Sequence, residues 1–192
     1  MTSRNTIPPN AKCVFKGEIF EVWQWEQKMY DGSTEIFERV RRPKTAQVIT
    51  VVGDKILTQI EEQPDKQREF PSIPGGRCNE GEDPLDGAKR ELAEETGLVS
   101  SDWILWKEIE PIIKIEWRVY TYIARNCTLK KKPSIDAGEK ITARFVSLEE
   151  FLEIATENPL FSSPEIVADL LWVRFDPAKK EEFSKLLFGG NS

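Results

Sequence analysis

The sequence predicts an α/β (α+β) domain in which a mixed β-sheet is packed between helices and is preceded by additional N-terminal strands. Three observations support this fold class. Short runs rich in Val, Ile, Phe and Trp, separated by turn residues, fill the first third of the chain. One well-capped helix follows near the middle, and helical periodicity returns only after residue 147.

The elements are expected in the following order. Residues 1–10 form a loose arm, and strands follow over residues 11–16, 19–28, 35–41, 45–52 and 55–60. The next element is the helix that begins after Asp83. Later strands are expected over residues 103–107, 115–127 and 141–146, and later helices from residue 148, over 164–173 and over 177–187. No internal repeat interrupts this order.

Composition and charge exclude several classes of protein. Hydrophobic residues make up 39% and charged residues 31% of the 192 residues, which is typical of a globular domain. The net charge of −6 argues against a general nucleic-acid or membrane-surface binder, and no apolar run reaches membrane-spanning length. The polar N-terminus lacks a signal-peptide core, and three unpatterned cysteines indicate reduced thiols, so a cytoplasmic location is expected.

The absence of histidine limits the possible chemistry. Without it, neither a Ser-His-Asp nor a Cys-His mechanism is available, and a general base working near neutral pH is expected to be a carboxylate.

The helix after Asp83 carries the main functional signal. Asp83 is a good N-cap, and Gly97 suits the position after the last turn. Glu91, Glu94 and Glu95 are spaced so that their carboxylates share one helix face. Such a row can be an ordinary solvated face, or it can bind a hard cation such as Mg²⁺ or Mn²⁺ through oxygen ligands.

The wider spacing favours the cation site. Gly76 is followed after five residues by Glu82, and after seven more by Arg90-Glu91-Leu92-x-Glu94-Glu95-x-Gly97-Leu98. This pattern matches the signature of the Nudix hydrolases without a gap, and the chain resembles that family. The resemblance implies a Nudix-type α/β/α sandwich. Outside the motif the likeness is to the branch of ADP-ribose pyrophosphatases and nucleoside-diphosphate-sugar hydrolases, and it is looser.

The resemblance implies a division of the chain and a set of site residues. Residues 1–44 would be an arm and β-meander that help to form a homodimer, and residues 45–192 would be the Nudix hydrolase domain with its C-terminal helices. The metal ligands would be the Gly75 carbonyl together with Glu91, Glu94 and Glu95. Glu82 would support the site by pairing with Arg90.

The general base and the substrate contacts are less defined. The branch often supplies an acidic residue from a late loop, for which this chain offers Glu139 first and Asp136 second, while a motif glutamate is a third option. Arg41, Arg42 and Gly76 are candidates for substrate binding, and the two arginines suit a phosphate or terminal ribose. Trp23 and Trp25 suit dimer contacts, base stacking or ordinary sheet packing.

Three positions depart from the branch. Glu61 stands where a basic residue is common, Ser72 stands where a glutamate is common, and Pro111 only approximately matches a proline associated with ADP-ribose. None of these changes affects the metal-binding residues. The departures leave hydrolysis as the expected activity and weaken the specific assignment of ADP-ribose.

The function expected from the sequence is therefore a Mg²⁺- or Mn²⁺-dependent pyrophosphohydrolase. The substrate would be a nucleoside diphosphate linked to a moiety X, most simply ADP-ribose or another nucleotide sugar, cleaved to a nucleoside monophosphate and a sugar phosphate. Two alternatives stay open. One is a hydrolase of nucleoside triphosphates or dinucleoside polyphosphates, and the other is a non-catalytic nucleotide sensor on the same fold.

Overall fold

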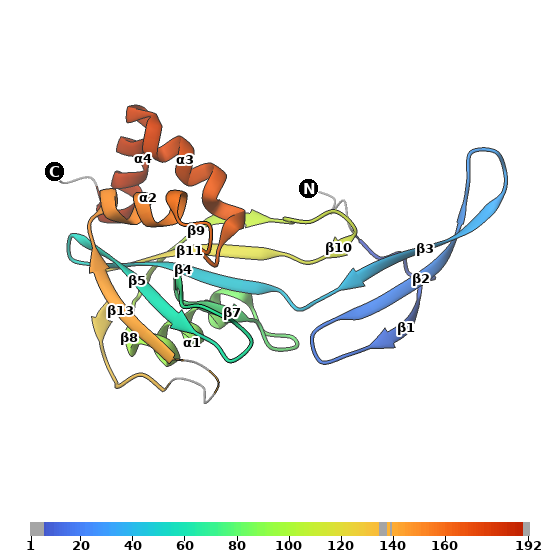
Figure 1. The fold of residues 1–192 in the computed structure, drawn as a ribbon, viewed down its shortest axis with the longest axis horizontal. Coiled ribbons are helices and arrows are strands. Elements are labelled where there is room, and N and C mark those ends of the chain that lie inside the picture. The colour runs from blue at the N-terminus through green and yellow to red at the C-terminus, as the bar shows by residue number, and fades with distance from the viewer. Residues whose placement is uncertain (1–5, 135–137, 139, 190–192) are drawn as a thin grey trace.

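The computed structural model describes residues 6–134, 138 and 140–189, and it has a mixed sheet between two layers of helices (Figure 1). The sheet has seven strands, five of them in the order β13-β5-β4-β11-β9. β11 runs parallel to β4 and antiparallel to β9. α1 covers one face of the sheet, and α2, α3 and α4 cover the other. The expected α/β/α arrangement is confirmed.

The bounds of the elements agree with the sequence-based expectation for most of the chain. The strands of the seven-stranded sheet are β4 (Thr45–Val52), β5 (Lys55–Glu62), β6 (Phe70–Ser72), β7 (Gly75–Arg77), β9 (Asp102–Ile109), β11 (Val119–Arg125) and β13 (Lys140–Val146). The helical elements are α1 (Pro84–Thr96), α2 (Leu148–Glu157), the 3₁₀ turn η1 (Pro164–Ile166), α3 (Val167–Phe175) and α4 (Pro177–Phe188). β8 (Leu98–Val99) and β12 (Thr128–Leu129) pair separately.

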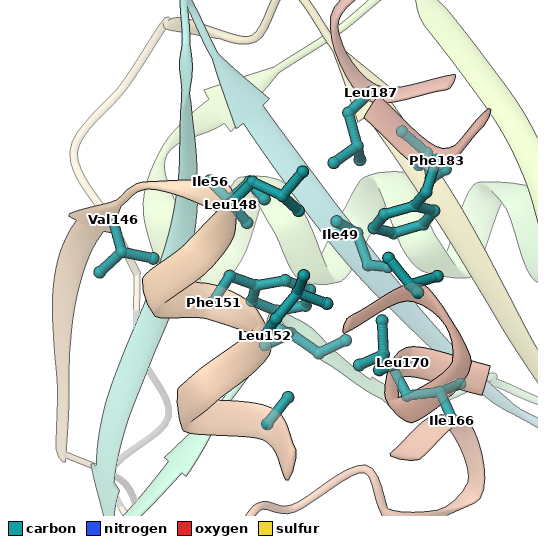
Figure 2. Packing of buried hydrophobic residues seen from close by; sticks show 14 of the residues in the cluster. Ile49, Ile56, Val146, Leu148, Phe151, Leu152, Ile166, Leu170, Phe183 and Leu187 are labelled. Atoms are coloured by element: carbon teal, nitrogen blue, oxygen red, sulfur yellow. The ribbon is translucent and has the colours of Figure 1, made fainter. Parts of the chain in front are cut away.

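Alternation along β4 divides the core between the two faces of the sheet. Ile49 and Val51 belong to the cluster packed against α2, α3 and α4, which Figure 2 shows around Phe151. Ala46 and Val48 belong to the cluster on the opposite face, which α1 covers. Because successive side chains of a strand point to opposite faces, one strand serves both layers. β4 therefore fixes the position of α1, with its carboxylates, relative to the rest of the fold.

The ends of α1 are capped as the sequence predicts. The Asp83 carboxylate accepts a hydrogen bond from the Leu85 amide at 2.9 Å, and Gly97 adopts a left-handed φ of 72°. Ala88 and Leu92 are fully buried and face the sheet. These two residues form an apolar stripe that sets the rotation of the helix about its axis, and the stripe therefore fixes the direction of Glu91, Glu94 and Glu95.

The N-terminal strands form a second sheet that projects from the sandwich (Figure 1). β1 (Lys12–Lys16), β2 (Glu21–Lys28) and β3 (Thr34–Arg41) form an antiparallel meander, and β10 (Ile115–Glu116) adds a parallel edge to β3. The prediction of one strand over residues 115–127 is therefore wrong. The chain leaves the N-terminal sheet after β10 and enters the central sheet at β11, and the break holds Trp117, whose indole donates to Thr45 Oγ1 at 3.0 Å.

Candidate active site

An ion pair joins the motif loop to α1. Arg90 Nε and Nη2 donate to the two carboxylate oxygens of Glu82 at 3.0 and 3.1 Å. Nη2 also donates to the Arg77 carbonyl at 3.0 Å. A bidentate guanidinium–carboxylate pair fixes both distance and orientation. The pair expected from the sequence is present, and it holds β7, the loop and the helix in one arrangement.

Glu91 and Glu94 lie beside the same guanidinium. Arg90 Nη1 donates to Glu91 at 2.8 Å and to Glu94 at 3.1 Å, so one cation offsets part of the repulsion between these neighbouring carboxylates. Glu91 also lies directly over Gly76. A Cβ atom added at Gly76 would be 2.4 Å from Glu91 Oε1, which is far inside van der Waals contact. The absence of a side chain at Gly76 thus creates the space that the Glu91 carboxylate occupies.

Glu95 is half-buried and faces β5 and β7. Its carboxylate accepts hydrogen bonds from Gln59 Nε2 at 2.8 Å and from the Gly75 amide at 3.3 Å. Burial raises the pKa of Glu95 to about 8, although both hydrogen bonds act in the opposite direction. The negative charges of Glu61 and Glu91 raise this pKa further. Such a perturbed carboxylate is typical of a functional site.

Ser72 gives Gln59 its orientation. The Ser72 hydroxyl donates to Gln59 Oε1 at 3.2 Å, which leaves the Gln59 Nε2 group to donate to Glu95. Both Ser72 and Gln59 are almost fully buried. The serine that looked like a departure from the branch therefore supports Glu95 through the Gln59 amide.

A pocket of about 750 Å³ opens beside Gly75. Arg42 and Trp117 line it and also line a second hollow, of about 740 Å³, next to the motif loop. The Arg42 guanidinium carbon lies 4.2 Å from the centre of the Trp117 ring. Stacking therefore holds the guanidinium at the pocket wall, and its buried Nε has no acceptor among the described residues.

The two predicted substrate arginines have different surroundings. Arg41 Nε donates to Glu116 at 2.7 Å, and its guanidinium stacks on Trp23 at 4.5 Å. Arg42 borders the pocket beside Gly75, and burial lowers the pKa of its guanidinium. Arg42 is thus the better placed of the two for a phosphate. Trp25, for its part, is buried and packs on Phe37 with ring centres 6.1 Å apart, in line with sheet packing.

Sequence reasoning missed two carboxylates that line the pocket. Glu61 comes from β5, and Glu165 comes from η1 near the C-terminal end of the chain. Burial raises the pKa of each. Glu61 was identified from the sequence only as a departure from the basic residue that is common there. Nothing in the local sequence around Glu165 indicates that η1 returns to the pocket beside Gly75. Only the packing of the C-terminal helices brings it there.

Comparisons with known proteins agree with this geometry. The family model described as the NUDIX domain matches residues 41–170. The chain belongs to the Nudix family. As a Nudix protein it is a pyrophosphohydrolase, an enzyme that acts on phosphorus anhydride bonds.

Similar proteins cover most of this Nudix chain. It is 25% identical over 159 residues to a methanol dehydrogenase activator of Bacillus methanolicus, across 81% of this chain and 85% of that protein. It is 23% identical over 159 residues to an ADP-ribose pyrophosphatase of Bacillus subtilis (strain 168), across 78% of this chain and 83% of that protein. A solved structure described as an ADP compounds hydrolase matches the fold with a TM-score of 0.70 at 21% identity, covering 86% of this chain and 90% of that one.

Nudix proteins generally use a divalent metal ion, for which the carboxylates of α1 are the candidate ligands. Within the described residues, no three acidic or thiol side chains are gathered as a ready-made metal site. Arg90 holds Glu91 and Glu94, while Gln59 and the Gly75 amide hold Glu95. Glu91 and Glu95 nevertheless both reach β7 from α1, and carboxylate oxygens suit a hard cation. The residues therefore fit a divalent ion after side-chain rearrangement.

Two further observations bear on the sequence-based expectations. Glu139 and Asp136, the loop candidates for the general base, lie outside the described residues, so their role stays a prediction. No helix in the described part of the chain is both long and apolar enough to cross a membrane.

The raised pKa of Glu95 predicts a pH dependence of stability in metal-free protein. Between the ordinary value near 4.5 and about 8, the folded state keeps a proton on Glu95 that the unfolded state has lost. The free energy of unfolding therefore falls as the pH rises through this range. Between pH 5 and pH 9, the free energy of unfolding of the wild type should fall by on the order of 3 kcal/mol more than that of the Glu95→Gln variant.

Urea unfolding in the presence of EDTA measures this difference. Glu94→Gln is the matched control, because the Glu94 side chain is 42% exposed and its removal should leave the wild-type slope in place. Parallel pH profiles for the wild type and Glu95→Gln would show that Glu95 titrates normally.

Proposed function

We propose that this protein is a Mg²⁺-dependent hydrolase of a nucleoside diphosphate linked to a sugar, with ADP-ribose as the leading substrate. One observation carries the proposal: the carboxylates of Glu91 and Glu95 converge from α1 on the backbone of Gly75 and Gly76, beside a pocket lined by Arg42. Two of the similar proteins are described as an ADP-ribose pyrophosphatase and an ADP compounds hydrolase, and these descriptions support the choice of substrate. The products would be a nucleoside monophosphate and a sugar phosphate.

The chain's own residues divide the work as follows. Glu91, Glu95 and the Gly75 carbonyl would hold the divalent ion, with Glu94 contributing to the same cluster. The ion would neutralise the diphosphate and lower the pKa of a bound water. Arg90 would keep α1 in place through Glu82, and the guanidinium of Arg42, which lines the pocket, would bind a phosphate oxygen. Glu139, Asp136 or a motif glutamate would take the proton of the attacking water.

Substitution of the α1 carboxylates tests the mechanism. Glu91→Gln and Glu95→Gln should each lower kcat/KM for ADP-ribose by about 100-fold or more, because each removes a charged oxygen ligand without changing side-chain size. Asp86→Asn on the same helix is the control, since Asp86 pairs only with Lys89 among the described residues. Steady-state release of AMP with Mg²⁺ gives the rates. Full activity of Glu95→Gln would contradict the mechanism.

The same assay separates the alternatives. A panel of ADP-ribose, UDP- and GDP-sugars, a nucleoside triphosphate and a dinucleoside polyphosphate identifies the preferred substrate class. Faster turnover of the triphosphate or the polyphosphate would replace the nucleotide-sugar assignment. Tight binding without turnover of any compound would favour a nucleotide sensor.

Arg42 is expected to bind the diphosphate. Arg42→Gln should raise KM about 10-fold or more, because it removes a charge-assisted hydrogen bond from a half-buried position. Arg41→Gln should have a smaller effect, since Glu116 already holds Arg41. Arg144→Gln, an exposed change on β13, is the control for altered net charge. An unchanged KM for Arg42→Gln would exclude Arg42 from substrate binding.

We also propose a homodimer formed through the N-terminal sheet, and a cytoplasmic location. Val14, Phe15 and Ile36 of this sheet are 53%, 59% and 61% exposed, and the sheet projects from the sandwich (Figure 1). Large apolar side chains left exposed on two strands of one small sheet support an interface there. The three cysteines, which are free thiols, suit a reducing compartment.

Light scattering after gel filtration tests the dimer. The wild type should elute with twice the 22.1 kDa mass of one chain, and the Phe15→Ser/Ile36→Ser double variant should elute as a monomer. Trp172→Ser/Phe175→Ser on α3 removes comparable exposed apolar surface elsewhere and should stay dimeric. A monomeric wild type, or a double variant that remains dimeric, would exclude this interface.

A further inference from the structure

The turn η1 brings a carboxylate from the C-terminal part of the chain to the pocket beside Gly75. Glu165 lines this pocket together with Arg42 and Gln47. The next residue, Ile166, is fully buried in the core that Figure 2 shows. The amide of Ser162 donates to the Pro71 carbonyl of β6 at 3.0 Å. Both ends of the turn are therefore anchored, and Glu165 has a fixed backbone position.

The Glu165 carboxylate has polar neighbours, but no cation among the described residues pairs with it within 4.0 Å. Burial raises the pKa of Glu165, while hydrogen bonding from Gln47 and the charge of Arg42 lower it. Gln47 is itself buried, and its amide donates to Thr121 Oγ1 at 2.8 Å, which limits its rotation. Arg42 acts from a distance, because the ion pairs within 4.0 Å among the described residues do not include Glu165. The carboxylate thus retains acceptor capacity toward the pocket.

The charge of Glu165 limits which part of a ligand can lie next to it. A phosphate group there would meet a carboxylate in a half-buried site, so the phosphates belong near Gly75 and Arg42 instead. A neutral group with O–H donors suits the position, because an ionised carboxylate only accepts hydrogen bonds and can accept from two adjacent hydroxyls at once. Hydrogen bonds to a charged acceptor are also the stronger ones. The vicinal hydroxyls of a sugar have this chemistry.

We propose that Glu165, which lines the pocket together with Arg42 and Gln47, binds the hydroxyl groups of the sugar attached to the diphosphate and thereby selects nucleotide sugars over diphosphate esters that lack them. The inference rests on the proposed function and deepens it, since it concerns the same pocket. A site built to bind hydroxyls discriminates strongly against analogues without them. Glu165 would therefore determine specificity while the α1 carboxylates perform the reaction.

A pair of ligands tests this role. ADP-ribose carries the terminal sugar, whereas the methyl ester of ADP keeps the nucleoside ribose and the diphosphate but lacks that sugar. Glu165→Gln should weaken binding and lower kcat/KM for ADP-ribose by about 10-fold or more, the effect of losing a hydrogen bond to a charged group. The same values for the methyl ester should change less than about 3-fold. Glu153→Gln, an exposed change on α2, should alter neither ligand.

Dissociation constants are measured by calorimetry with Ca²⁺, and rates are measured separately with Mg²⁺. Equal losses for both ligands, or no loss for either, would overturn the assignment, and equal losses would place Glu165 at the shared nucleotide instead. If the wild type binds both ligands without hydrolysing them, the proposed function fails while the dissociation constants still test Glu165. If it binds neither ligand, the assignment fails as well. Thermal unfolding checks that Glu165→Gln is folded, and Glu165→Asp replaces it in the same comparison if it is not.

Discussion

The close approach of α1 to the backbone of β7 is the constraint on which the site depends. A Cβ atom at Gly76 would lie 2.4 Å from Glu91 Oε1, and one at Gly75 would lie 2.6 Å from the Ala46 carbonyl oxygen of β4. Because Gly76 has no side chain, the Glu91 carboxylate can lie over its backbone. Because Gly75 has none, β7 can lie close against β4. Ala88 and Leu92 of the same helix pack against the sheet in the buried cluster that contains Ala46 and Val48. Packing and charge placement therefore come from one arrangement, because the stripe that buries α1 also directs its glutamates.

One arginine contributes to the electrostatic balance of this arrangement at three carboxylates. Arg90 pairs with Glu82, Glu91 and Glu94. Among the described residues Glu95 forms no ion pair within 4.0 Å, and removal of its carboxylate from water favours the protonated form in the folded state. A divalent ion would supply the missing positive charge, and its binding would release the proton from Glu95. The metal-free protein thus carries an electrostatic cost at the position where the proposed function needs a divalent ion.

Local signals predicted α1 well, and long-range packing determined what they missed. Asp83, Gly97 and the apolar stripe act within a few residues of one another, so the sequence was enough to predict the bounds and orientation of the helix. The same spacing predicts that carboxylates of α1 bind the metal, and this role stays a prediction. The break between β10 and β11 was not predicted, because it depends on pairing with β3 and β4, which lie far away in the sequence. Likewise, the contact between Gln59 and Glu95 joins residues 36 positions apart, and no local pattern indicates it.

In the proposed function, the residues that perform the reaction and the residues that select the substrate come from different parts of the chain. Gly75 and α1 come from one continuous stretch, in which helix spacing fixes the geometry of the charged oxygens. Arg42 comes from the junction between β3 and β4, and Glu165 comes from a turn held by the C-terminal helices. These two residues can be changed without disturbing the caps or the packing of α1, since neither takes part in them. A fold built in this way can keep one reaction while distant segments alter the compound it accepts, which is why the motif predicts hydrolysis more firmly than it predicts the sugar.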